Sequence, residues 1–153
     1  MSVIESTSVA REVEIAARPE TVWKLLTDPN DYVRWMGSRA TLEVRPGGKY
    51  HVDVVPGHVA SGKFVEVDPP RKLVFTWGWE GSAGVPPGSS TITFELIPRG
   101  KGTLLRFTHR DLPDASAVAS HAEGWDHYFD RLATVASGGN PGIDPWMEQK
   151  GSK

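Results

Sequence analysis

Acid–base chemistry in this chain would depend on its histidines, and His109 is the first candidate. It follows Leu105 and Phe107 at every second position, so it shares their face of a predicted strand. If that face points inward, the imidazole could act as a general base or a hydrogen-bond donor in a pocket. The alternative is a surface histidine at the end of the strand, beside Arg110 and Asp111.

A second candidate is the pair His51 and Asp53, which share one face of another predicted strand. Tyr50, Val52 and Val54 occupy the opposite face. This alternation favours the apolar set as the inner one and places the histidine and the aspartate outside. The outer face of a half-wrapped sheet can also carry valine, so the pattern leaves the direction open.

The last predicted helix carries the residues closest to a metal-ligand spacing. Glu123 and His127 are four positions apart, which places them on one helix face. His121 and His127 lie about 240° apart around a helix, so they do not converge. The apolar stripe of this helix should face the sheet and leave Glu123 and His127 in solvent. We therefore expect neither a metal nor a cofactor.

The composition excludes several other chemistries. The 153 residues include no cysteine, so disulfides, cysteine-ligated zinc and thiol catalysis are absent. The chain has no Gly-x-Ser-x-Gly elbow, and Gly78, Gly81 and Gly84 lack the strand-to-helix setting of a phosphate-binding loop. The net charge is −2 and basic residues are dispersed, which argues against nucleic-acid binding.

The chain also lacks the signals of a membrane or export protein. It has no run of about 18 apolar residues, so we expect no membrane span. The residues after Met1 have neither the basic region nor the long apolar region of a secretory leader. These observations predict a cytoplasmic protein.

The unusual feature of the composition is its six tryptophans. Trp77 and Trp79 share one strand face with Leu73 and Phe75. Such an aromatic face must contact a helix or line a cavity, and Trp79, at the end of its strand, is expected at a pocket mouth. Matching inward side chains are predicted on the next two strands and the last helix: Ile92, Phe94, Leu96, Leu105, Phe107, Trp125 and Phe129.

Short elements must position these side chains. Alternation predicts a strand over residues 8–16, and proline placement predicts a helix from Pro19 to Thr27. A second short helix is expected from residue 30 or 31 to Met36. Further strands are predicted over residues 41–45, 49–55, 58–67, 71–79, 90–97 and 103–109. A long helix then follows Asp114, the expected N-cap, and ends at residues 137–139.

This order of elements predicts an α+β fold. Sequential strands joined by short turns imply a curved antiparallel sheet of about seven strands. The long C-terminal helix must cover its apolar face, and one helix, about 10–12 Å wide, should leave a cavity on the concave side. We expect one domain over residues 8–138. Residues 139–153, with Trp146, form a tail that is either a loose arm or a strap over the domain.

Several ordered motifs carry a resemblance to a known family. The segments RPETVW (residues 18–23) and LTDP (residues 26–29), with Trp35, resemble the start of the activator of heat-shock protein 90 ATPase homologues. This family belongs to the START-like (SRPBCC, helix-grip) superfamily. RPGG (45–48), GKFVEVDPPRKLVFTW (62–77), TITF (91–94), GT (102–103) and GW (124–125) continue the resemblance, which covers about residues 8–136.

The resemblance implies a helix-grip fold with a deep apolar pocket between the sheet and the last helix. It implies no shared catalytic residue. Together with the aromatic faces, it predicts a standalone domain that binds a small apolar or aromatic ligand. The side chains expected to contact that ligand are Trp35, Trp77, Trp79, Phe94, Phe107, His109, Trp125, Tyr128 and Phe129. Either His109 or Tyr128 is expected to orient a polar group of the ligand.

The sequence is also compatible with two other functions. One is an enzyme of the cyclase or aromatase kind, which would use a pocket histidine. The other is a protein-interaction or chaperone-regulating module with an exposed apolar patch. Family members that stimulate the heat-shock ATPase carry an additional N-terminal domain, which we do not expect in this chain. A homodimer is compatible with the sequence.

Overall fold

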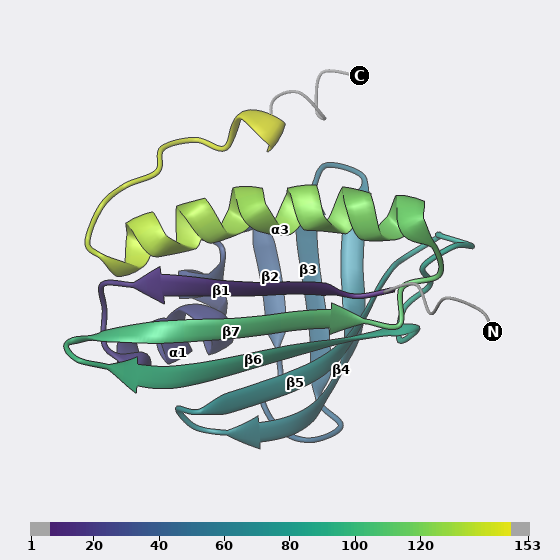
Figure 1. Ribbon diagram of the computed structural model, residues 1–153. Helices are drawn as coiled ribbons and strands as arrows, with labels where there is room; N and C mark the ends of the chain where they lie inside the picture. Colours follow the sequence, from purple (N-terminus) through teal and green to yellow (C-terminus); the bar gives the residue numbers. More distant parts are fainter. Residues whose placement is uncertain (1–6, 148–153) are drawn as a thin grey trace.

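The computed structural model describes residues 7–147 and has the predicted α+β helix-grip architecture. Seven antiparallel strands form one sheet in the order β1-β7-β6-β5-β4-β3-β2. The sheet bends, and α3 runs along one side of it (Figure 1). The strands are β1 (Val9–Ile15), β2 (Arg39–Leu42), β3 (Lys49–Val55), β4 (His58–Asp68), β5 (Lys72–Trp79), β6 (Ser90–Arg99) and β7 (Gly102–Arg110). The helices are α1 (Pro19–Thr27), α2 (Pro29–Tyr32) and α3 (Ala115–Ala136).

The second helix is shorter than predicted, and so is the strand that follows it. The side chain of Asp28 accepts a hydrogen bond of 2.9 Å from the backbone N–H of Asn30, so α2 begins at Pro29. The helix ends at Tyr32 instead of Met36. β2 covers residues 39–42 and not the predicted 41–45.

The alternation of β3 has the predicted direction. Tyr50, Val52 and Val54 are buried, whereas His51 and Asp53 are only half-buried. Tyr50 stacks on Phe75 of β5 with 4.3 Å between ring centroids, so the inward faces of these strands form one aromatic core. No helix within the described residues is long and apolar enough to cross a membrane.

The end of β5 is held by the loop of residues 80–89, which folds back on it. A Cβ atom at Gly78 would lie 1.8 Å from the backbone oxygen of Pro86, so only glycine permits this approach. One residue later, the backbone N–H of Trp79 donates a 2.7 Å hydrogen bond to the oxygen of Val85. The loop therefore fixes the backbone from which the Trp79 side chain projects.

The long helix α3 begins where the sequence predicts. Asp114 is its N-cap, and the side chain accepts a hydrogen bond of 2.9 Å from the backbone N–H of Ala117. The buried side chains of α3 are Trp125, Tyr128, Phe129, Leu132 and Val135, which form the apolar stripe that covers the sheet.

Candidate functional site

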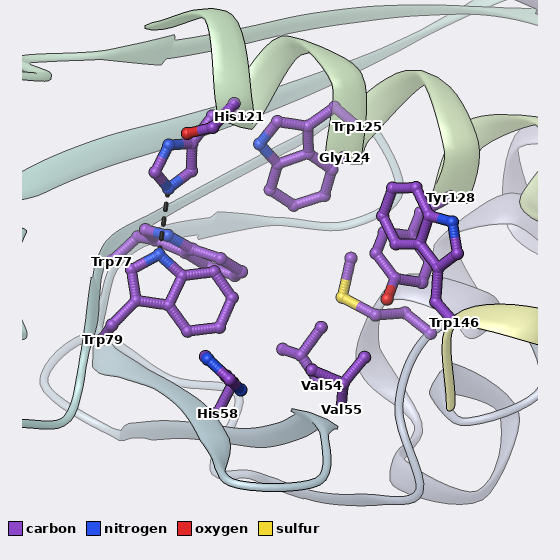
Figure 2. Close-up of a pocket in the computed structure, with 12 residues that line it drawn as sticks. Val54, Val55, His58, Trp77, Trp79, His121, Gly124, Trp125, Tyr128 and Trp146 are labelled. Carbon is purple, nitrogen blue, oxygen red and sulfur yellow. Dashed lines mark hydrogen bonds between the residues drawn. The ribbon is translucent and has the colours of Figure 1, made fainter. Parts of the chain in front are cut away.

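A cavity of about 300 Å³ lies between the end of β5 and α3. Trp77 and Trp79 of β5 face Trp125 of α3 across it (Figure 2). Trp77 contacts both other indoles, with ring centroids 5.2 Å from Trp79 and 5.3 Å from Trp125. Val54 and Val55 at the end of β3 complete the apolar lining from below (Figure 2).

His121 holds Trp79 in place. The indole Nε1 of Trp79 donates a hydrogen bond of 3.0 Å to Nε2 of His121, drawn as a dashed line in Figure 2. The other imidazole nitrogen, Nδ1, donates to the backbone oxygen of Ala117 at 2.8 Å. Both nitrogens are thus occupied, and the bond from Trp79 requires the neutral imidazole.

His109, on β7, holds Trp125 in the same way. The indole Nε1 of Trp125 donates to Nδ1 of His109 at 3.1 Å. Nε2 must then carry the proton, and it donates to the Ser90 hydroxyl at 2.8 Å. The Ser90 hydroxyl donates in turn to the backbone oxygen of Trp77 at 2.8 Å. The imidazole is fully buried, so the surface position considered for it is wrong.

The surroundings of both histidines favour their neutral forms. Burial lowers the pKa of His109 to about 3, with a further contribution from the neighbouring His121. Burial also lowers the pKa of His121, against the opposing effect of its hydrogen bond to Ala117. Neither imidazole therefore has an unoccupied nitrogen, and burial lowers the pKa of both, which makes each a weaker base.

The C-terminal strap, residues 140–147, closes one end of the cavity. Trp146 lines the cavity and stacks on His127 of α3, with 3.8 Å between ring centroids and 6° between planes. Asp144 is buried, and its Oδ1 lies 2.8 Å from Nε2 of His127 and accepts a hydrogen bond from the backbone N–H of Trp146 at 2.9 Å. The expectation that His127 lies in solvent is therefore wrong, whereas Glu123 is exposed.

Two buried polar atoms of the cavity lining have no hydrogen-bond partner. They are the hydroxyl of Tyr128 and Nε1 of Trp77. Tyr128 projects from α3, and its oxygen points toward the two valines of β3 (Figure 2). Burial raises the pKa of Tyr128, and the carboxylate of Asp144 raises it further, so the phenol keeps its proton at neutral pH.

Gly124 leaves space on the helix side of the cavity. It lies within α3 and lines the cavity, and a Cβ atom added there would meet nothing within 4 Å. Glycine inside a helix costs about 1 kcal/mol relative to alanine. Gly124 therefore destabilises α3 locally, at a position where a larger side chain would enter the cavity.

The structure separates the nine side chains predicted for ligand contact into two groups. Trp77, Trp79, Trp125 and Tyr128 line the cavity. The other five, Trp35, Phe94, Phe107, His109 and Phe129, are buried in the core and do not belong to the lining.

Sequence reasoning missed much of the remaining lining. His121 is four residues before Trp125, so helical spacing could have placed it on the same face. Met36 follows α2 in a turn, His58 begins β4 at the exposed rim, and Trp146 lies in the strap. No periodic pattern connects these three positions to the cavity.

The lining suits binding of an uncharged apolar molecule. Among the described residues that line the cavity, none is an aspartate, glutamate, lysine or arginine. Within residues 7–147, no three histidine or acidic side chains gather as a metal site would require. Small-molecule sites are commonly apolar hollows of roughly 300–1,000 Å³ with a few placed polar groups.

The fold and the cavity together define a helix-grip domain with an apolar internal site. Residues 16–137 match the family described as "Activator of Hsp90 ATPase homolog 1-like protein", and the chain belongs to that family. The human activator of 90 kDa heat shock protein ATPase homolog 1 is 30% identical over 112 residues. That match covers 72% of this chain but only 31% of the human protein, so the chain spans about a third of its length.

Solved structures of bacterial proteins are similar over most of the chain. An AHSA1-like protein from Rhizobium etli is 50% identical with a TM-score of 0.75, covering 93% of this chain and 89% of the other. CalU16 from Micromonospora echinospora is 29% identical with a TM-score of 0.76, covering 94% and 72%.

Proposed function

We propose that this chain binds a small apolar or aromatic molecule in the cavity between β5 and α3, without covalent chemistry. The observation that carries the proposal is the set of three indoles, Trp77, Trp79 and Trp125, around a space of about 300 Å³. Two of these indoles are held in place by hydrogen bonds to histidines. Fixed aromatic side chains offer a large apolar contact area at little cost in conformational entropy.

Binding is better supported than catalysis by a pocket histidine. His109 and His121 each accept a hydrogen bond from an indole and donate the second nitrogen's proton within the protein. Burial lowers the pKa of both groups. A general base needs an open nitrogen within reach of its substrate and a pKa near the working pH.

Binding is also better supported than chaperone regulation. A docking module of that kind would present an exposed apolar patch. Within residues 7–147, Val65 on β4 and Ile143 in the strap are the large hydrophobic side chains with high exposure. Two single residues on separate elements do not form such a patch, whereas the indoles gather around the cavity.

Native mass spectrometry of freshly purified protein tests the proposal. We expect a small molecule to accompany the folded protein, and to be absent from the same sample after denaturation in organic solvent. A protein stripped of that molecule should take up members of a panel of neutral aromatic compounds and lipids, with a change in tryptophan fluorescence. A protein that carries nothing and binds no member of the panel would contradict the proposal.

A further inference from the structure

The two buried polar atoms of the lining that lack a partner can both donate a hydrogen bond. Nε1 of Trp77 and the hydroxyl of Tyr128 are both buried without a partner. An indole N–H can only donate, and a neutral phenol has one proton to donate. A buried donor without a partner costs about 1–3 kcal/mol, which a bound acceptor would offset.

Tyr128 is better placed than His109 to bind a polar group of a ligand. Both nitrogens of His109 are engaged, with Ser90 and Trp125, and its ring is not part of the lining. The Tyr128 hydroxyl is directed into the cavity, toward the valines of β3 (Figure 2). Burial and the nearby Asp144 carboxylate raise its pKa, so it remains a hydrogen-bond donor over the physiological range.

Among the described residues, the lining of the cavity offers no counter-charge to an anionic ligand. No lysine or arginine is among the described lining residues, so a buried carboxylate would have no counter-charge in the lining. Outside the lining, the buried Asp144 carboxylate acts on Tyr128 electrostatically, and Arg131 acts on Tyr128 in the opposite sense with a smaller effect. Burial of a charge without a partner is strongly unfavourable.

We propose, on the basis of the proposed function, that the ligand is an uncharged apolar molecule with a carbonyl or ether oxygen that accepts a hydrogen bond from Tyr128. The apolar part contacts Trp77, Trp79 and Trp125. The oxygen lies at the end of the cavity nearest the strap. This defines the ligand as a neutral ketone, ester or ether of modest size, as distinct from a hydrocarbon or a carboxylic acid.

Three bicyclic probes of similar size test this inference: 2-acetylnaphthalene, 2-ethylnaphthalene and 2-naphthoate. Their dissociation constants are measured by tryptophan fluorescence for the wild type and for Tyr128→Phe. The control is Tyr50→Phe, which removes a buried hydroxyl outside the lining. We expect the wild type to prefer the ketone. We expect Tyr128→Phe to reduce the preference for ketone over ethyl compound by roughly threefold to tenfold, the range for one hydrogen bond.

The outcomes separate the two proposals. If the ketone and the ethyl compound bind but Tyr128→Phe leaves their ratio unchanged, or if Tyr50→Phe changes it equally, the role of Tyr128 is overturned and the proposed function stands. If 2-naphthoate binds more tightly than the ketone, the neutral ligand class is overturned. If none of the three probes binds the wild type, the proposed function fails for molecules of this size, and the inference fails with it.

Discussion

The indole Nε1 of Trp79 donates a 3.0 Å hydrogen bond to Nε2 of His121, which joins the last residue of β5 to α3 along one side of the cavity. The geometry determines which imidazole nitrogen carries the proton. Nδ1 of His121 carries it, because Nδ1 donates to the backbone oxygen of Ala117. The imidazole thus acts as a fixed acceptor that positions an aromatic side chain. The bond between His109 of β7 and Trp125 of α3 repeats this relationship.

Removing the acceptor should release Trp79. In His121→Ala, the indole N–H loses its partner, and we expect the free energy of unfolding to fall by about 1 kcal/mol. Binding of a neutral fluorescent probe, N-phenyl-1-naphthylamine, should weaken as well. His121→Gln retains an acceptor oxygen and should recover part of both losses, while His51→Ala, outside the lining, should change neither. Equal probe binding by the alanine variant and the wild type would contradict this role.

The buried His109 should make stability depend on pH. Burial lowers its pKa to about 3, whereas the unfolded chain has the ordinary value of about 6.5. The unfolded state therefore takes up the proton first as the pH falls. The stabilisation that the neutral His109 gives the folded state is complete above about pH 6.5 and is lost progressively toward about pH 3. By about pH 5 the free energy of unfolding should have fallen by roughly 2 kcal/mol.

Denaturant unfolding between pH 7 and pH 4 measures this contribution. His109→Gln can still accept from Trp125 and donate to Ser90, but it does not titrate. The variant should therefore lose less stability on acidification than the wild type. Carboxylates affect both proteins alike, so the difference reports on His109 together with its coupling to the neighbouring His121. Parallel pH profiles would show that the imidazole is not buried in its neutral form.

The strap should contribute to binding through Trp146. Trp146→Ala removes the indole that lines the end of the cavity and stacks on His127. We expect the affinity for the neutral probe to fall roughly threefold to tenfold, the range for an aromatic contact. Ile143→Ala is the matched control, since Ile143 belongs to the same segment and is 79% exposed. A loss of affinity in both variants, or in neither, would contradict a specific role for Trp146.

The sequence was sufficient to predict the sheet, the long helix and the inward faces, because these follow from periods of two and 3.6 residues. Periodicity does not indicate which inward aromatic side chains pack as solid core and which line a cavity. Phe107 lies with its ring centroid 5.3 Å from Phe94 and 4.8 Å from Phe129, so these rings pack against one another as solid core. Trp77 and Trp79 share the face of Phe75 but lie farther along the strand, where the cavity begins.

The position of Trp146 could not be predicted for a different physical reason. Its place depends on contacts with α3, among them the one between Asp144 and His127, which are 17 residues apart and belong to no common repeat. The pairing of each indole with a histidine is equally non-local, since Trp79 and His121 are 42 residues apart. Such contacts depend on the tertiary arrangement of α3, the sheet and the strap, which sequence patterns do not specify.

Filling the cavity from Gly124 tests the binding site most directly. The titration uses N-phenyl-1-naphthylamine with the wild type, Gly124→Ala and Gly124→Leu, and the stability of each protein is measured alongside. Alanine should stabilise α3 by roughly 0.5–1 kcal/mol and leave most of the space open. Leucine should retain the fold and abolish saturable binding, because its side chain would occupy the space that surrounds the missing Cβ. If folded Gly124→Leu binds the probe as tightly as the wild type, the cavity between β5 and α3 is not the binding site.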